Sequence, residues 1–124
     1  MTLSIHKQQV NVGDPIYYTD AFRAMIEQHL TFLRQPDVSI AEKVDPSLIR
    51  QFDGDFYGLL QFLDIQTQYH WIVLRVNKFD NPLQFGRIVR DVYAPTHEFT
   101  LRIPNTEIIE ELRSNFLQSR RSVG

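Results

Sequence analysis

Prolines set the limits of the regular segments in this chain. A proline inside a helix removes a backbone hydrogen bond and clashes with the preceding turn, and in a sheet it is confined to edges and ends. The chain has six prolines, and Pro36, Pro46, Pro82 and Pro104 each stand between one apolar pattern and the next. The sequence therefore predicts several short helices and strands, with one helix before Pro36 and another after Pro104.

Three segments have the spacing of an amphipathic helix, in which apolar residues recur three and four positions apart. The first follows Thr19 or Asp20, either of which can cap a helix by accepting a hydrogen bond from a free backbone N–H. The second follows Asp55, and the third follows Asn105 or Thr106. Their apolar faces are formed by Phe22, Ile26, Leu30 and Leu33, by Phe56, Leu59, Leu60 and Leu63, and by Ile109, Leu112 and Phe116.

Two segments alternate between apolar and polar residues, as half-buried strands do. They are residues 38–44 and residues 99–103, the second of which is ended by Pro104. Beyond the last helix, we expect residues 119–124 to form a mobile tail. One core beneath the two central helices is predicted to contain Leu59, Leu60, Trp71, Ile72 and Leu101.

Two further segments are ambiguous. Residues 48–52 fit a strand that runs into a Gly-Asp turn, and they also fit a helix capped by Asp45 with Pro46 in its first turn. Residues 69–76 favour a strand through their β-branched side chains, but a short buried helix has the same pattern. Propensity alone does not decide between these alternatives.

The charge and cysteine content exclude several classes of function. Lys and Arg total 13 against 15 Asp and Glu, so there is no basic excess for a phosphate backbone and no nucleic acid partner is expected. The chain has no cysteine, which excludes disulfides, a thiolate nucleophile and a Cys-type zinc site. No stretch approaches the length of about 20 apolar residues that a membrane helix needs, so no membrane partner is expected either. The first residues lack the apolar run of a signal peptide, which predicts a protein made and assembled in the cytoplasm.

Few residues suggest chemistry. The four histidines, His6, His29, His70 and His97, are far apart in sequence and none forms a ligand pair at helical spacing. His70 is the best catalytic candidate, but a lone histidine in an apolar run is more often a satisfied core residue. Trp71 is likewise interpreted as a core residue, and the Asp53 and Asp55 pair as turn and cap residues rather than a calcium loop. We therefore expect no catalytic residue, no cofactor site, no metal site and no enzyme.

The arginines have a structural interpretation. Arg75 lies among apolar residues, so if it is buried it needs a carboxylate or carbonyl partner on this chain or a neighbour. Four further arginines are interpreted as a solvated face. This set is Arg34, Arg87, Arg90 and Arg102.

Two segments of the chain resemble one known family. Residues 15–23 (PIYYTDAFR) lead into a Thr-Asp-x-Phe-Arg helix start, and residues 68–77 (QYHWIVLRVN) are followed by the Asp-Asn-Pro of residues 80–82. In this order they resemble the baseplate wedge protein of T-even-type contractile bacteriophages, whose central part has a LysM-like fold. In that family a Tyr-Trp-rich helix ends in Asn before an Asp-Pro loop, so the resemblance implies a helix at residues 68–77.

The resemblance implies an α+β fold, a small LysM-like β-α-α-β module with an N-terminal helix and a C-terminal helix. The opening strand and Gly-Asp turn of such modules are similar to residues 48–60, and the closing strand is similar to residues 101–104. The implied organisation is an N-terminal arm and helix at 1–45, the LysM-like module at 46–104, and a C-terminal helix and tail at 105–124.

The implied role is that of a structural component of a contractile phage tail baseplate, which joins neighbouring wedge subunits through protein–protein contacts. Its partners would be other baseplate and tail proteins, with several copies in each assembly. It would lie in the virion, in the tail baseplate, after assembly in the host cytoplasm. Two departures from the family are a longer loop at 85–97 and the absence of a counterpart to residues 38–46. The alternatives are a LysM-type module that binds peptidoglycan or another carbohydrate, and a small cytosolic enzyme that uses His70.

Two groups of residues are expected to contact other proteins. The helical stripe before Pro36 is set apart from the module, so we expect it to pack on a neighbour rather than fully on its own domain. The loop at 85–97 carries apolar residues and arginines suited to an assembly contact, although an added edge strand is the alternative. The candidate interface residues are Phe22, Ile26, Leu30, Leu33, Phe85, Arg87, Ile88, Arg90 and Tyr93.

Overall fold

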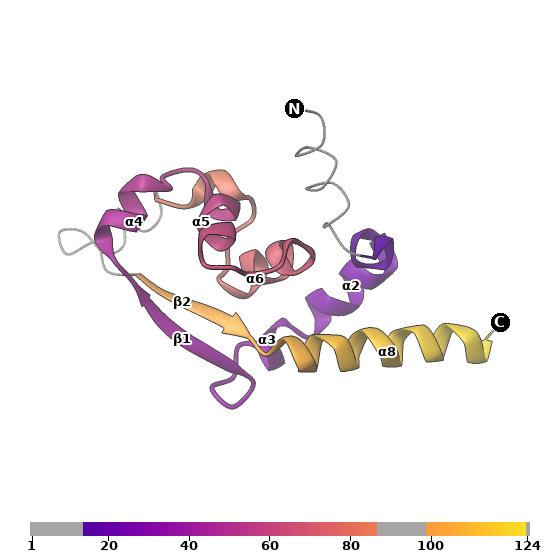
Figure 1. Ribbon diagram of the computed structural model, residues 1–124. Helices are drawn as coiled ribbons and strands as arrows, with labels where there is room; N and C mark the ends of the chain where they lie inside the picture. Colours follow the sequence, from indigo (N-terminus) through magenta and orange to yellow (C-terminus); the bar gives the residue numbers. More distant parts are fainter. Residues whose placement is uncertain (1–13, 87–98, 124) are drawn as a thin grey trace.

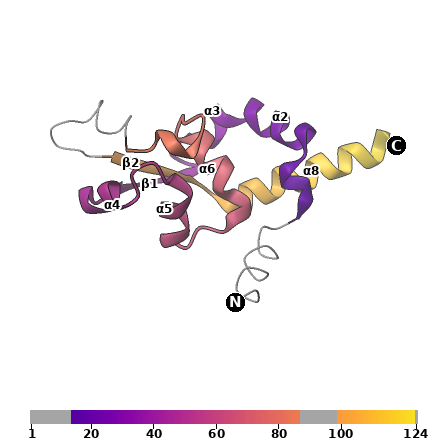
Figure 2. The ribbon, with the colours of Figure 1, turned by 90° about the horizontal axis from the view of Figure 1, so that it is seen from above.

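The structure, a computed structural model, describes residues 14–86 and 99–123, with side chains as far as residue 120. It is a small α+β protein with two antiparallel strands, β1 (Ser39–Val44) and β2 (Phe99–Pro104) (Figure 1). Several short helices come between these strands along the chain. The helices between the strands lie on one side of the strand pair, and a long helix follows β2 (Figures 1 and 2). This arrangement confirms the α+β class.

The remaining elements form three groups along the chain. Before β1 lie the 3-10 helix η1 (Pro15–Tyr18) and the helices α2 (Asp20–Gln28) and α3 (Leu30–Leu33). Between the strands lie α4 (Pro46–Gln51), α5 (Phe56–Phe62), η2 (Thr67–Tyr69), α6 (His70–Val76) and η3 (Pro82–Gln84). After β2 comes α8 (Thr106–Val123).

Side-chain caps begin most of the longer helices, as the sequence predicts. Thr19 Oγ1 accepts a hydrogen bond from the Phe22 N–H at 3.3 Å, and Asp55 Oδ1 accepts one from the Gly58 N–H at 3.0 Å. Asn105 caps α8 in the same way. These bonds satisfy N–H groups that the first turn of a helix leaves without a partner.

Two helices end in a left-handed residue that is not glycine. Asp64 follows α5 with φ 62°, and Lys78 follows α6 with φ 69°. In each case the chain folds back so that a later N–H bonds to the last turn, from Ile65 to the Leu60 carbonyl and from Phe79 to the Leu74 carbonyl. This is the geometry of a Schellman ending, which satisfies free carbonyls and turns the chain sharply.

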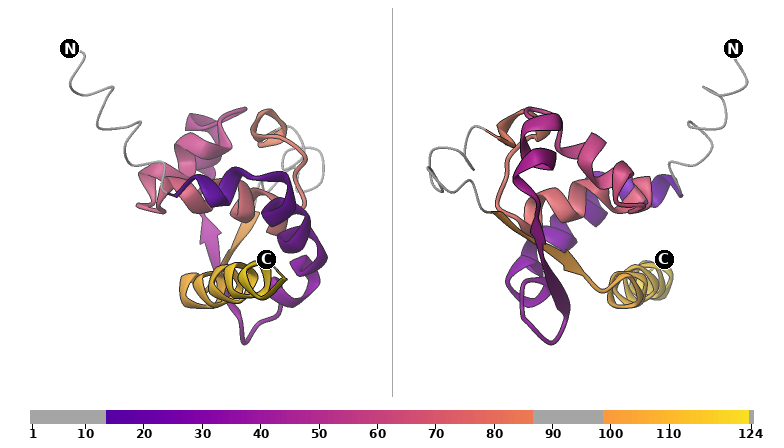
Figure 3. Two further views of the ribbon diagram at one scale, coloured as in Figure 1. Left: turned by 90° about the vertical axis from the view of Figure 1, so that its right-hand side faces the viewer. Right: turned by 60° about the vertical axis from the view of Figure 1, so that its left-hand side comes forward.

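A single apolar core joins all parts of the described chain. The five residues predicted for it, including Leu60, Ile72 and Leu101, are all buried in one cluster. Four phenylalanines, Phe56, Phe79, Phe85 and Phe99, pack ring against ring at one end of this core. At the other end, Phe22 of α2 contacts Phe116 of α8, with ring centroids 5.5 Å apart. The left view of Figure 3 shows α8 end-on with α2 beside it.

The structure corrects several sequence interpretations of local structure. Residues 48–51 belong to helix α4, capped by Asp45, and Phe52 is its C-cap, so the alternative of a strand there is wrong. The first strand is β1, within residues 38–44 as the alternation predicts, and it pairs with β2. Residues 70–76 are helical, as the resemblance implies. Helix α8 runs to Val123, which contradicts a mobile tail from residue 119.

The prediction that the first apolar stripe reaches a neighbouring protein is wrong. Phe22, Ile26 and Leu33 are fully buried, and Leu30 is only 6% exposed. The reason is that the helix breaks at His29, so that α2 and α3 bend around the module. The stripe thereby packs on α6 and on Phe116 of α8 and forms part of the chain's own core.

Candidate interaction surface

His70 is a structural residue. It is buried, its Nε2–H donates to the Ile65 carbonyl oxygen at 2.7 Å, and its ring packs on Tyr57 with centroids 5.6 Å apart. Burial lowers the pKa of His70, since an imidazolium would lose its hydration there, and the bond to Ile65 offsets this only in part. The interpretation of His70 as a satisfied core histidine is confirmed. Trp71 is also a core residue, with the Arg23 guanidinium 5.2 Å from the centre of its ring.

Arg75 finds its partners on this chain. Its Nε donates to Glu27 Oε2 at 2.8 Å, and its Nη1 donates to Asp80 Oδ1 at 2.9 Å and to the Phe79 carbonyl at 2.7 Å. The pKa of Arg75 is raised, first by the hydrogen bond to Glu27. Arg75 therefore ties α6 to α2 and to the turn that follows α6.

Sequence reasoning missed two long-range links, one at the end of α6 and one between β2 and β1. Arg34 is not part of a solvated face, because its Nε and Nη2 donate to the Val76 and Arg75 carbonyls, both at 2.8 Å. Arg102 is also engaged, since its Nη1 donates to Ser39 Oγ at 2.9 Å. Both links join residues far apart in sequence, so no local pattern indicates them.

A carboxylate cluster fixes α8 to the N-terminal part of the chain. Glu110 Oε2 accepts hydrogen bonds from the hydroxyls of Tyr17 and Tyr69, the latter at 2.8 Å, and Oε1 accepts one from Arg113 Nε at 3.0 Å. Burial acts to raise the pKa of Glu110, but these hydrogen bonds outweigh it and lower the pKa. The pKa of Tyr17 is raised by burial and by its bond to Glu110. These bonds link α8 to η1 and η2, and the cluster is called the Glu110 latch below.

The sequence-predicted interface residues do not form an exposed surface where they are described. Phe85 is fully buried between the rings of Phe56 and Phe99, and the four residues of the first stripe are buried as well. Its assignment to an assembly contact is therefore wrong. The other loop residues of that set lie outside the described residues. They are Arg87, Ile88, Arg90 and Tyr93.

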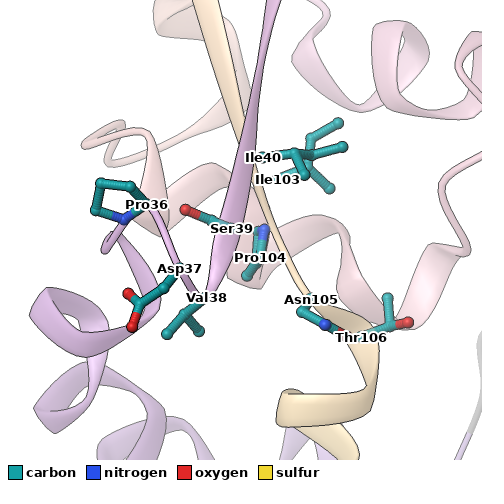
Figure 4. A pocket seen from close by; sticks show the side chains of 9 residues that line it. All are labelled: Pro36, Asp37, Val38, Ser39, Ile40, Ile103, Pro104, Asn105 and Thr106. Carbon is teal, nitrogen blue, oxygen red and sulfur yellow. The ribbon is translucent and has the colours of Figure 1, made fainter.

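The structure instead has a hollow at the corner where the chain enters β1 and leaves β2 (Figure 4). Its volume is about 450 Å³. The side chains of Ile40 and Ile103, which are register partners, lie next to each other there, and Ile40 is 57% exposed. The hollow is lined by Pro36, Asp37, Val38, Ser39, Ile40, Ile103, Pro104, Asn105 and Thr106.

The hollow continues into an exposed strand edge. Four consecutive residues of β1, from Ile40 to Lys43, are exposed. Arg102 turns its N–H and C=O away from β1, because both bond to the side chain of Asn77. Its register partner Ala41 must then also point its N–H and C=O away from β2, as must Lys43 two residues on. No hydrogen bond from another described residue reaches these outward groups.

No family model matches this chain, and no curated protein or solved structure is significantly similar to it. Within residues 14–86 and 99–123, no group of three or more His, Asp or Glu side chains could hold a metal ion. No helix in the same ranges is long and apolar enough to cross a membrane. The candidate site is the β1 edge with its adjoining hollow, which together offer outward backbone groups and the side chains of Ile40 and Ile103.

Proposed function

We propose that this chain is a structural component of a contractile phage tail baseplate, and that it joins neighbouring wedge subunits through protein–protein contacts. The observation that carries the proposal is the open edge of β1 beside an apolar hollow. A large aliphatic side chain such as Ile40, more than half exposed next to free backbone groups, is suited to be covered by another protein. The proposed location is the tail baseplate of the virion.

The order of the elements supports the LysM-like part of the proposal. Strands β1 and β2 are the first and last elements of residues 39–104, antiparallel and adjacent, with the helices α4, α5 and α6 packed on one side. In this proposal β1 takes the place of the opening strand expected at residues 48–52, so the module begins before residue 46. A β-α-α-β module has this arrangement, here with one additional short helix. The family motif that ends a helix in Asn corresponds to Asn77, which links α6 to β2.

The use of the polar side chains supports a scaffold rather than an enzyme. The groups whose pKa values are shifted by burial or by hydrogen bonds, such as His70, Tyr17 and Glu110, hold elements of the fold together. Catalytic sites need such groups to face a cleft where a substrate binds. The lining of the hollow, by contrast, has Asp37 as its only titratable side chain.

Tail purification tests the proposal directly. A tagged copy of the chain is produced in cells that assemble the contractile tail, and the tails are purified and analysed by quantitative mass spectrometry. We expect several copies in each baseplate. Ile40→Asp should lower incorporation strongly, whereas Phe62→Asp should not, because Phe62 is equally exposed at 57% but lies on α5. Absence of the chain from purified tails would refute the role.

Peptidoglycan binding is the competing function for a LysM-like module. Sedimentation of the purified chain with insoluble peptidoglycan separates the two. A chain that sediments with the glycan, is displaced by soluble chitin fragments and is absent from purified tails is a carbohydrate-binding module. Retention in tails without sedimentation supports the structural role.

A further inference from the structure

We propose that the outer edge of β1 binds an extended segment of a different protein as a third, antiparallel strand. Four consecutive residues of this partner segment are, in order, an acidic residue, a basic residue, any residue and an apolar residue. This inference rests on the proposed function, since it names the kind of segment that a neighbouring tail protein would supply. It adds the recognition chemistry, which the proposed function does not specify.

Among the described residues the two edges of the sheet differ, and only the edge of β1 has no hydrogen-bond partner. The edge of β2 is closed by the Asn77 amide, which satisfies the Arg102 N–H and C=O. The edge of β1 presents the N–H and C=O groups of Ala41 and Lys43 to solvent, flanked by exposed side chains. Backbone groups in this alternating pattern are the template that strand addition uses.

A second copy of β1 does not fit this edge. Two identical strands that pair edge to edge and antiparallel are related by a twofold axis perpendicular to the sheet, which leaves each face on the same side. Because side chains alternate between the two faces along a strand, an even-numbered residue is then always opposite an even-numbered residue of the copy, and an odd-numbered one opposite an odd-numbered one. Glu42 is therefore placed opposite Glu42, Ile40 or Val44 of the copy and never opposite Lys43. No register places Glu42 opposite Lys43, and the register centred on Glu42 places the two Glu42 carboxylates directly opposite each other.

A different strand can complement all three exposed side chains. Running antiparallel, it places an acidic residue opposite Lys43 and, next in its sequence, a basic residue opposite Glu42. The residue after that lies opposite Ala41, and an apolar side chain then lies opposite Ile40, beside Ile103 and the hollow. Opposite charges and apolar pairs directly across two strands stabilise their pairing.

Synthetic peptides test the strand directly with the intact chain. The probe is the capped peptide Thr-Val-Glu-Lys-Thr-Ile-Thr, and binding is measured by titration at low salt with NMR. Hydrogen exchange of the Ala41 and Lys43 amides provides a second readout. We expect saturable binding and slower exchange at both amides. Swapping the peptide's Glu and Lys should weaken binding at least about fivefold, because two attractive pairs become repulsive.

Two controls separate strand addition from other binding. N-methylation of the peptide residue opposite Ala41 removes a bond to β1 and should abolish binding, whereas N-methylation opposite Glu42 points away and should not. The double variant Glu42→Lys, Lys43→Glu should reverse the preference, so that it binds the swapped peptide at least about fivefold more tightly than the original.

The outcomes distinguish this inference from the proposed function. No binding of any peptide, or binding indifferent to both N-methylation sites, overturns the strand proposal while incorporation into tails leaves the structural role intact. A self-associated chain whose Ala41 amide is protected without peptide also overturns it, in favour of a second copy. Specific peptide binding by a chain that is absent from tails supports the strand site and refutes the proposed role.

Discussion

The side-chain amide of Asn77 serves β2 in the place of a neighbouring strand. Its Nδ2 donates to the Arg102 carbonyl at 2.9 Å, and its Oδ1 accepts from the Arg102 N–H at 2.9 Å. The same Nδ2 also donates to the Val73 carbonyl at 2.7 Å, in the last turn of α6. A single residue thus satisfies a helix end and a sheet edge and fixes the distance between them.

Removal of this amide should destabilise the protein. We expect Asn77→Ala to lower the free energy of unfolding by about 1–3 kcal/mol, because it leaves partly buried backbone groups of β2 unsatisfied. Asn77→Asp should cost at least as much, since a carboxylate cannot donate to the Arg102 and Val73 carbonyls. Urea denaturation measures both variants. Gln66→Ala, at an exposed position whose side chain makes no cap bond, is the control and should stay within about 0.5 kcal/mol of the wild type.

Helix α5 offers a matched test of core burial. Leu60 is fully buried, whereas Phe62, two residues later, is 57% exposed. Leu60→Ala should lower the free energy of unfolding by about 2–5 kcal/mol through lost burial and the cavity left behind. Phe62→Ala removes a larger side chain but should cost less than about 1 kcal/mol. Similar losses for both variants would contradict the orientation of α5.

The Glu110 latch predicts a dependence of stability on pH. The pKa of Glu110 is lower in the folded protein than its usual range, so the unfolded chain binds a proton first as the pH falls. The stabilisation is fully present above the unfolded pKa of about 4.3 and is lost as the pH falls through the folded pKa. Glu110→Gln should flatten the fall in unfolding free energy below pH of about 4.3. The exposed Glu111 on the same helix is the control, and an equal effect of Glu111→Gln would refute the latch.

Glycine at the left-handed positions after α5 and α6 should make the protein more stable. Lys78 and Asp64 adopt positive φ values that cost a residue with a Cβ more than they cost glycine. Lys78→Gly and Asp64→Gly should each raise the free energy of unfolding by about 0.5–1 kcal/mol, which is this relief minus the entropy that glycine loses on folding. Gln61→Gly, inside α5, should instead lower it by about 1 kcal/mol. Thermal denaturation of the three variants shows whether each substitution raises or lowers the stability.

The features that the sequence predicted well depend on neighbouring residues. The caps at Thr19, Asp55 and Asn105, and the alternation at residues 99–103, are local patterns, and the structure has each of them. Residues 48–52 were ambiguous because a segment of one or two turns is too short for its apolar spacing to distinguish a helix from a strand.

The features that it missed depend on the tertiary arrangement. The apolar stripe that includes Phe22 shows that a helix has a face to bury, but not whether the chain's own helices or another protein cover it. Links such as the one from Arg34 to Val76 join a side chain to a distant backbone carbonyl and leave no trace in local spacing. The candidate surface was missed for the same reason, since the exposure of Ile40 depends on what the rest of the chain leaves uncovered.

The pairing of Ser39 with Pro104 determines how the molecule responds to tension. Because the chain enters β1 and leaves β2 at the same end of an antiparallel pair, a pull between α3 and α8 loads the ladder as a zipper. Its bonds break one after another, beginning with the 2.8 Å bond from the Asn105 N–H to the Val38 carbonyl, and never share the load. The resistance to such a pull therefore comes from outside the sheet. It comes from two contacts with α8, the hydrogen bond from Tyr17 to Glu110 and the packing of Phe22 on Phe116. Both contacts must break before the strands can separate.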